Sequence, residues 1–432
     1  MKDLLIIGGG TGGIMTAAQF LKKGGVNVTI LEPAEYHYYQ PAWTLVGANA
    51  YDFEKTKRTM ASVMPKGVNW IKEFASTFDC ANNSVITSSG KTLKYDYLVV
   101  SPGIKIDTSL VKGLTEAIDK GVVCSNYTNP KHTWEVLKNF EGGTALFTQP
   151  ATPIKCGGAP QKIMYLAEEY FKKSGVRKNT NVVFATPGGV IFGVKPIAKT
   201  LMEVINRKDI NVRYHHKLVE VDAENQIAWY EITKDPKAGG CVLMEDKDNS
   251  SMEIDESINY NNKNIVVSKE NGRWGIHFDM LHLAPPQTAP DFIKNSDLAN
   301  EAGWLDVDHG TLQHKKYDNV FGLGDAAALP TAKTGAAIRK QVPIVVENIA
   351  RLIAANPLSS KTYNGYSSCP LVTGYGKMVL AEFDYDSNFT PDPKLKQMLV
   401  FDSSKEHRRL WWLKKYILPR LYWNKMLKGV EV

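Results

Sequence analysis

The sequence predicts an α/β protein with two Rossmann-like domains, the second inserted into the first, and a helical segment at the C-terminus. Three observations predict this fold class. A glycine-rich turn follows the first apolar strand, a strand ending in Gly324–Asp325 appears much later, and another apolar strand with its own glycine turn, over 182–189, lies between them. Apolar strands that alternate with helical stretches are typical of parallel α/β sheets.

The domain boundaries follow from where these signatures lie. The predicted limits are 1–108 and 286–355 for the two parts of the first domain, 109–285 for the inserted second domain and 356–432 for the C-terminal region. The length of the chain allows roughly two to four domains. The polar composition of 233–263 predicts an exposed insertion in the second domain, with Cys241 inside it.

Composition excludes several classes of protein. Hydrophobic residues make up 43% of the chain, which excludes disorder as its main feature. The net charge of +7 is a mild excess and gives no reason to expect nucleic acid. The five cysteines form no C-x-x-C pair, so we expect neither a zinc ribbon nor any other metal site. Without a signal peptide or an apolar run of roughly 18 residues, a cytoplasmic protein with no membrane span is expected.

The first element pair carries a dinucleotide fingerprint. Strand, glycine turn, helix and strand follow one another over 4–31, and the G-x-G-x-x-G pattern lets a pyrophosphate approach the helix N-terminus. Glu32 ends the second strand, where a carboxylate can bind a ribose hydroxyl. A purely structural glycine turn is the alternative. The predicted turn residues are Gly8, Gly10, Thr11 and Gly13.

A second signature distinguishes flavin from nicotinamide. The apolar strand over 317–325 ends in Gly324–Asp325 and precedes Lys333, Thr334 and a helical stretch over 335–354. This resembles the second FAD signature of two-dinucleotide-domain flavoprotein reductases, which implies FAD with Asp325 on the ribityl chain. The helix N-terminus near Thr334, together with Lys333, would stabilise negative charge on reduced flavin. The alternative is a surface Gly-Asp turn.

Two further turns complete the flavoprotein pattern. The strand over 97–100 leads into a turn that ends at Gly103, where the chain leaves the first domain. In the second domain, 188–193 has the wrong glycine spacing and bulky residues where a pyrophosphate needs backbone access. We therefore expect an absent or degenerate NAD(P)H site and a different reductant for the flavin.

Two cysteine motifs point to redox chemistry. Cys156 follows Lys155 and precedes two glycines and a predicted helix over 163–171, a setting that lowers the pKa of a thiol. A buried structural cysteine is the alternative at this position. Cys369 lies in a predicted turn before a strand, next to Pro370.

At these motifs the chain resembles the sulfide:quinone oxidoreductases, most closely the mitochondrial and related bacterial type, over nearly its whole length. The resemblance implies that Cys156 and Cys369 are the redox-active pair beside the isoalloxazine ring, and that the oxidised pair can hold a bridging sulfur. Hydrogen sulfide would attack this pair, leaving a persulfide on Cys156 and a thiolate on Cys369 that donates to flavin C4a. Reduced FAD would pass two electrons to membrane quinone, and sulfite, glutathione or sulfide would accept the sulfane sulfur.

Other side chains have open roles. Cys124 lies 32 residues before Cys156, as does a third cysteine in other types of the family, so it could relay sulfur, attach flavin covalently or be an inert core thiol. His132, Glu168 and His282 are candidates for a general base.

The C-terminus combines aromatic and basic side chains over 407–428, as expected at a membrane surface. Pro419 should split this stretch into two helical pieces, and the apolar face of the second piece should meet the lipid. We expect a peripheral membrane protein on the cytoplasmic face of a prokaryotic inner membrane. A tail docked on its own domain or on a partner subunit is the alternative, and a homo-oligomer is open. The apolar face consists of Tyr422, Trp423, Met426 and Leu427.

Two rival functions share parts of this pattern. A type II NADH:quinone dehydrogenase has the same flavin architecture, but the degenerate second glycine turn and the two cysteine motifs disfavour it. A flavin-binding redox partner without turnover is the second rival.

Overall fold

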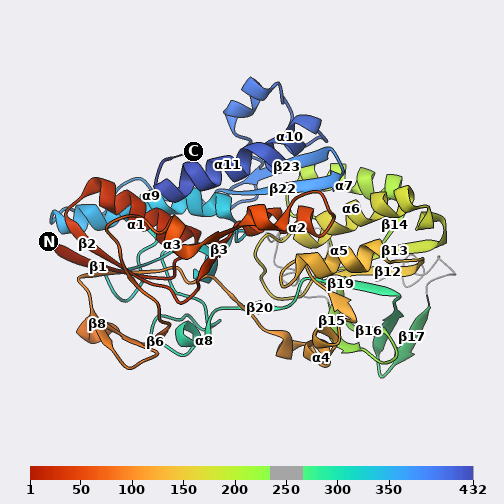
Figure 1. Cartoon of the computed structure of the whole chain (residues 1–432), viewed down its shortest axis with the longest axis horizontal. Helices are drawn as coiled ribbons and strands as arrows, with labels where there is room; N and C mark the ends of the chain where they lie inside the picture. The colour runs from red at the N-terminus through yellow and green to blue at the C-terminus, as the bar shows by residue number, and fades with distance from the viewer. Residues whose placement is uncertain (234–265, 432) are drawn as a thin grey trace.

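The computed structural model describes residues 1–233 and 266–431. Almost all of the predicted polar insertion, with Cys241, lies outside these described residues. The chain forms two parallel sheets side by side along the long axis of the molecule, as Figure 1 shows.

The first parallel sheet holds the glycine fingerprint. Its strands run in the order β21, β9, β1, β2 and β5, which are Val320–Gly322, Tyr97–Val100, Lys2–Ile7, Val26–Leu31 and Asn69–Ile71. Helix α1 (Thr11–Lys23) connects β1 to β2 and packs beside α9 (Gly335–Ile353). Since β21 follows the whole second sheet in sequence yet pairs with β9, the chain returns to complete the first sheet.

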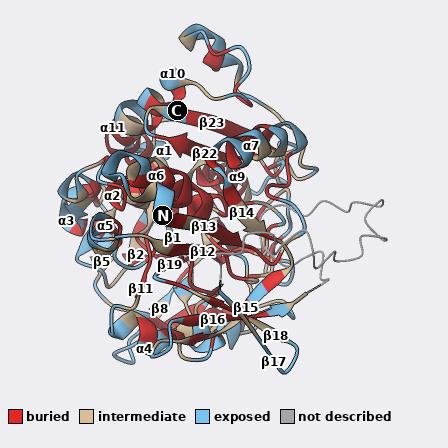
Figure 2. Cartoon of the chain, turned by 90° about the vertical axis from the view of Figure 1, so that its right-hand side faces the viewer, coloured by how far each residue is buried: buried red, intermediate tan, exposed pale blue. Residues whose placement is uncertain are grey.

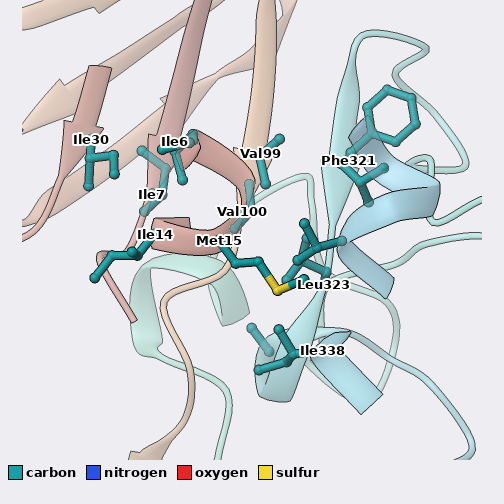
Figure 3. Close-up of a cluster of buried hydrophobic side chains, with 14 of the residues drawn as sticks. Ile6, Ile7, Ile14, Met15, Ile30, Val99, Val100, Phe321, Leu323 and Ile338 are labelled. Carbon is teal, nitrogen blue, oxygen red and sulfur yellow. The ribbon is translucent and has the colours of Figure 1, made fainter. Parts of the chain in front are cut away.

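The core of this sheet explains why its strands are nearly all apolar. Side chains of β1, β9 and β21 meet those of α1 and α9 in one buried cluster (Figure 3). Gly12 lets α1 approach closely, because a Cβ at this position would collide with the side chain of Leu323. Strands covered on both faces lose the polar alternation of exposed sheets.

The second parallel sheet has the same architecture. Its strands run in the order β11, β19, β12, β13 and β14, which are Val123–Cys124, Met280–Leu283, Gly143–Thr148, Thr180–Ala185 and Ile210–Arg213. The helices that accompany it are α4 (Leu114–Asp119), α5 (Pro130–Lys138), α6 (Ala159–Ser174) and α7 (Lys195–Lys208). An antiparallel sheet packs against it through a shared apolar core, and its strands are β15 (His216–Asp222), β16 (Ile227–Ile232), β18 (Arg273–His277) and β17 (Val267–Glu270).

Smaller elements link and border the two parallel sheets. The short strands are β3 (Tyr36–Tyr38), β4 (Lys57–Thr59), β6 (Ala75–Asp79), β7 (Ser84–Thr87), β8 (Thr92–Lys94), β10 (Lys105–Ile106) and β20 (Gln287–Thr288). The short helices are α2 (Trp43–Val46), α3 (Met60–Val63) and α8 (Asp291–Lys294). The two parallel five-stranded sheets confirm the predicted fold class, whereas the exact domain limits stay a prediction.

A C-terminal hairpin of β22 (Ser367–Gly374) and β23 (Lys377–Phe383) packs against α6 and α9. Cys369 lies within β22 and pairs with Ala381, so the predicted turn at this cysteine is wrong. Its apolar neighbours along β22 are buried and favour an extended strand. In Figure 2 the hairpin and the strands of the parallel sheets are largely buried, while the outer helices carry the exposed residues.

The last part of the chain is one continuous helical run. Helix α10 (Arg408–Trp412), a π-helical turn (Leu413–Ile417) and α11 (Leu418–Asn424) follow without a break, so Pro419 does not split them. Inside this run Pro419 removes one backbone hydrogen bond, and the π-helical turn, a common site of helix irregularity, lies directly before it. Among the described residues, no helix combines the length and apolarity needed to cross a membrane.

The prediction that the apolar face of this run meets the lipid is also wrong. All four side chains of that face are buried in the core of the first sheet, and the turn after α11 packs against α1 (Figure 1). An amphipathic helix needs an apolar partner, and here the protein itself supplies one. The alternative, a tail docked on its own domain, is therefore correct for four side chains, which are Tyr422, Trp423, Met426 and Leu427.

Candidate active site

The two motif cysteines come together although 213 positions separate them. The Sγ atoms of Cys156 and Cys369 lie 3.9 Å apart, within reach of a thiol hydrogen bond. Cys156 comes from the loop before α6, and Cys369 comes from β22. Gly158 permits this approach, because a Cβ there would lie 2.8 Å from the Cys369 sulfur.

The backbone of Cys156 is fixed in an uncommon conformation. Its φ of +54° lies in the left-handed region, which residues other than glycine seldom adopt. The N–H of Cys156 donates to the carbonyl oxygen of Lys333 at 2.8 Å, and the Tyr127 hydroxyl donates to the carbonyl of Lys155 at 3.0 Å. The first bond ties the cysteine loop to the predicted flavin signature at Lys333, and the second holds the residue before the cysteine.

A buried lysine lies directly against the pair. The Nζ of Lys162, on α6, donates to the Sγ of Cys156 at 2.8 Å. The hydrogen bond with Cys369 and the charge of Lys162 together hold the pKa of Cys156 well below its ordinary value, although burial opposes them. In return, the adjoining thiolates raise the pKa of Lys162 against the effect of burial. The site therefore stabilises a thiolate at Cys156.

A second buried lysine reaches the site from the C-terminal helical run. Burial, followed by repulsion from Lys162, lowers the pKa of Lys414 to about 7, and its Nζ donates to the carbonyl of Pro41 at 3.1 Å. Sequence reasoning missed both lysines. It expected Lys155 to be the basic neighbour of the thiol, but the Lys155 side chain donates to Gln40 instead. The position of Lys162 six residues after Cys156 was a usable signal, because the start of a helix brings such a residue back toward the preceding loop.

The predicted dinucleotide turn has the conformation that its glycines require. Gly8 has a φ of +99°, and a Cβ at Gly13 would collide with the Gly8 carbonyl oxygen. Among the described residues, a Cβ at Gly10 would meet no atom within 4 Å beyond its chain neighbours, so the backbone is open there. The Glu32 carboxylate accepts hydrogen bonds from the N–H groups of Gly9 and Ala34, both at 2.7 Å. A cavity of about 950 Å³ adjoins this turn and is lined by Gly8, Glu32, Pro102 and Ile104, among others.

The residues of the second FAD signature lie near the cysteine loop. Asp325 lies in a short turn after β21, and burial raises the pKa of its carboxyl group against the opposing charges of Lys155 and Lys333. Burial lowers the pKa of Lys333 to about 8. Thr334 caps α9, its Oγ1 accepting from the N–H of Ala337 at 3.1 Å. Gly103 and Gly324 adopt φ values of +81° and +74°.

These residues fit an adenine dinucleotide that carries flavin. The open space at Gly10 and the adjoining cavity give room at the turn, and free helix N–H groups there favour a pyrophosphate. The hydrogen bond from the N–H of Cys156 to the carbonyl oxygen of Lys333 brings the cysteine pair next to the end of the site that is expected to hold the flavin ring.

The third cysteine lies apart from this arrangement. Cys124 ends β11 in the second sheet, where its Sγ donates to the carbonyl of Leu281 at 3.6 Å. Burial raises its pKa to about 12, which keeps the thiol protonated. These features favour the inert core thiol among its three open roles.

The candidate general bases have other surroundings. Glu168 is buried between the ammonium groups of Lys172 and Lys208, at 2.6 and 2.9 Å, in an ion-pair cluster. Burial lowers the pKa of His282 to about 3, and its Nε2 accepts from the backbone of Asn126 at 3.2 Å. His132 lies in α5, which Asn129 caps. None of these contacts involves the cysteine pair.

The degenerate glycine turn of the second domain is filled by protein. Ile191 and Phe192 are buried, and the Phe192 ring packs edge-on against Phe383 of β23, with 6.2 Å between ring centroids. A Cβ at Gly189 would lie 2.9 Å from the His215 ring. Side chains thus occupy the turn after β13 where a second pyrophosphate would need backbone access.

Fold and site together define a flavoprotein disulfide oxidoreductase with two dinucleotide-type domains. Residues 2–138 match the family model described as pyridine nucleotide-disulphide oxidoreductase. The chain is 43% identical over 430 residues to the mitochondrial sulfide:quinone oxidoreductase of Mus musculus, covering 99% of this chain and 86% of the relative. It is 39% identical over 437 residues to the mitochondrial enzyme of Dictyostelium discoideum, covering 99% and 86%. This chain belongs to the sulfide:quinone oxidoreductase family, whose members are FAD-dependent flavoproteins.

A solved structure extends the likeness to the whole fold. The sulfide:quinone oxidoreductase of the hyperthermophilic bacterium Aquifex aeolicus superimposes with a TM-score of 0.73 at 19% identity, over 98% of this chain and 92% of the other.

Proposed function

We propose that this protein oxidises hydrogen sulfide through the Cys156–Cys369 pair and passes the electrons through FAD to a membrane quinone. The observation that carries the proposal is the sulfur pair itself, with Sγ atoms 3.9 Å apart and the Lys162 ammonium 2.8 Å from Cys156. Two thiols at this distance can be oxidised to a disulfide that takes part in thiol–disulfide exchange. A buried ammonium favours the thiolate that such exchange needs.

The first step is thiol–disulfide exchange with hydrosulfide as the nucleophile. Hydrosulfide attacks the Cys156 sulfur of the oxidised pair, so a new S–S bond forms while the Cys156–Cys369 bond breaks. Cys156 then carries a persulfide that keeps the proton of hydrosulfide, and Cys369 leaves as a thiolate. The Lys162 ammonium stabilises the negative charge that develops between the two sulfurs.

The second step removes the sulfane sulfur and restores the pair. A soluble nucleophile takes the terminal sulfur, the proton passes to solvent, and Cys156 becomes the second thiolate. The two thiolates then give up two electrons and re-form their bond. A bridging sulfur would need the two Sγ atoms to move closer than their present 3.9 Å, because two S–S bonds of about 2.05 Å meet at a bent central sulfur and span clearly less than their summed length of about 4.1 Å.

Bound FAD supplies the two-electron link between the cysteine pair and the quinone. The residues that would hold it are Gly8, Gly10, Thr11, Gly13, Glu32, Gly103, Gly324, Asp325, Lys333 and Thr334. The N-terminus of α9, together with Lys333, provides positive potential for a reduced, negatively charged flavin ring.

Sulfite, glutathione and sulfide are the proposed acceptors of the sulfane sulfur. All three are small nucleophiles that can attack the outer sulfur of a persulfide. Mixing each acceptor with the sulfide-treated protein and identifying the sulfur-containing product distinguishes them. A homo-oligomer stays a prediction, and sedimentation of the purified protein tests it.

Attachment to a membrane surface is proposed through an apolar patch on the C-terminal region. The patch side chains are exposed by 41 to 76%, unusually high for large apolar residues. Exposed basic side chains on the same run suit anionic headgroups. The patch consists of Leu399, Phe401, Trp412, Tyr416 and Ile417.

Point substitutions in this patch test the membrane role. The double variant Phe401→Ser/Trp412→Ser should release the protein from anionic vesicles and slow quinone reduction, while sulfide still bleaches the flavin. Substituting exposed Val190, which lies in the second domain outside the patch, provides the control. Unchanged vesicle binding of the double variant would contradict the patch. The prokaryotic inner membrane expected from the sequence has no support in the comparisons, since the mouse and Dictyostelium relatives are named mitochondrial.

The NADH dehydrogenase alternative is tested by the same bleaching experiment. NADH should leave the flavin oxidised, because side chains fill the turn where its pyrophosphate would bind. Bleaching by NADH without bleaching by sulfide would favour the alternative. A protein that responds to neither reductant would be the non-catalytic flavin partner.

A further inference from the structure

The end of the chain makes an unexpected connection to the dinucleotide turn. The hydroxyl of Tyr422, on α11, lies 2.8 Å from the Oγ1 of Thr11, the first residue of α1. The same hydroxyl lies 2.5 Å from the Nε2 of His37, and the Nδ1 of His37 lies 3.3 Å from the carbonyl oxygen of Gly9. Three segments far apart in sequence thus meet at the glycine turn.

The direction of these hydrogen bonds follows from their chemistry. The Gly9 carbonyl can only accept, so a neutral His37 carries its proton on Nδ1 and accepts on Nε2. Tyr422 must then donate to His37 and accept from the Thr11 hydroxyl. Each hydrogen bond of the relay thus has one defined direction, and both Tyr422 and His37 are buried. Such a fully satisfied buried network fixes one geometry.

In the glycine turn, the Glu32 carboxylate accepts from the N–H of Gly9 at 2.7 Å, and His37 lies at the carbonyl oxygen of the same residue, so the relay adds a second hold on the turn. The next residue, Gly10, caps α1 without a side-chain hydrogen bond, and in the described part of the chain no atom beyond its chain neighbours lies within 4 Å of where its Cβ would be. Tyr422 also packs its ring against Tyr39, with centroids 4.7 Å apart. Beyond α11, a Cβ at Gly429 would lie 2.9 Å from the backbone of Gln19, so the chain end lies tightly along α1.

We propose that Tyr422 is a positioning residue for FAD, which fastens the phosphate-binding turn through Thr11 and His37 before the cofactor binds. Preorganisation of a turn lowers the cost of ordering it when the ligand arrives. The proposal rests on FAD binding at this turn as part of the proposed function. It also means that the C-terminal helical run serves two purposes, because Trp412, Tyr416 and Ile417 of the exposed patch lie on the same run as the anchor at Tyr422.

The test compares Tyr422→Phe with Tyr416→Phe. Both variants lose one hydroxyl from the same helical run, but Tyr416 is 52% exposed. The readouts are the rate at which full-length holoprotein releases FAD, the FAD dissociation constant of the stripped protein, and its thermal unfolding without FAD. Tyr422→Phe should weaken FAD binding about tenfold, the effect of leaving a buried partner unsatisfied, and Tyr416→Phe should leave it unchanged.

Two further variants separate the possible reasons for failure. If Tyr422 and His37 act through one relay, the double variant Tyr422→Phe/His37→Gln should bind FAD about as weakly as the worse single variant. Val204→Ala removes buried apolar atoms in the second domain and reports what destabilisation alone does to FAD affinity. The proposal is overturned if Tyr422→Phe retains wild-type FAD affinity, or if Val204→Ala weakens it as much. Retention of FAD by Gly10→Val would instead overturn the FAD site itself.

Discussion

Replacing Lys162 with methionine should raise the pKa of Cys156 and suppress its thiolate. The substitution keeps most of the buried volume on α6 but removes the ammonium that donates to the Cys156 sulfur at 2.8 Å. A hydrogen bond to a charged group contributes about 1.5–3 kcal/mol, and one pKa unit corresponds to about 1.4 kcal/mol. The pKa of Cys156 should therefore rise by about one to two units, and at a pH below both pKa values its thiolate population and reactivity should fall about 10- to 100-fold.

The rate of alkylation of Cys156 measures this change. The reduced protein is treated with iodoacetamide over a range of pH, and the modified peptide is quantified by mass spectrometry. Lys173→Met is the matched control, because Lys173 is an exposed lysine on the same helix. Sulfide-dependent bleaching of the flavin should slow in parallel for Lys162→Met and stay unchanged for the control. An unchanged pH midpoint for Cys156 in Lys162→Met would refute the role of the buried ammonium.

Three other predictions follow from single features of the structure. Gly10→Val should fold but stay colourless, whereas Gly13→Ala should fail to fold, because only the second substitution collides with protein backbone; circular dichroism and flavin absorbance distinguish them. Cys369→Ser should abolish sulfide oxidation and Cys124→Ser should preserve it, since Cys124 is a buried protonated thiol; stopped-flow flavin reduction tests both, and loss of activity in Cys124→Ser would favour three-cysteine chemistry. Burial lowers the pKa of His37 from 6.5 to about 4, so the unfolded chain takes up a proton at this histidine before the folded protein does as the pH falls. About 3 kcal/mol of the free energy of unfolding that is present above pH 6.5 should therefore be lost by pH 4. Acid unfolding of His37→Gln should lack this loss.

The parts predictable from sequence were those with local signatures. The glycine fingerprint specifies strand, turn and helix within one short stretch, and the structure shows a steric reason for the glycines at Gly8 and Gly13. Gly13 must lack a side chain beside the Gly8 carbonyl, whereas the need for a glycine at Gly10 stays a prediction that depends on bound FAD. The return of the chain at Asp325 followed from a second local signature, so the fold class could be predicted well.

The parts that could not be predicted depend on contacts between distant segments. No local sequence feature indicates that Lys414 reaches the cysteine pair, because its neighbours at the C-terminus resemble a solvated basic stretch. The amphipathic face around Tyr422 was found correctly, but sequence periodicity shows only that a face is apolar and does not identify its partner. The sequence predicts a turn at Cys369, where Pro370 stops a helix, whereas pairing with β23 holds both residues in a strand. The approach of Cys156 and Cys369 was expected only from family resemblance.

Anaerobic mixing of the purified flavoprotein with sulfide is the measurement that tests the central claim most directly. The account predicts that sulfide bleaches the flavin, that a quinone analogue restores its colour, and that NADH has no effect. The Cys369→Ser protein should keep its flavin but remain oxidised under the same conditions. Bleaching of the wild-type flavin by NADH with no response to sulfide, or full bleaching of Cys369→Ser by sulfide, would contradict it.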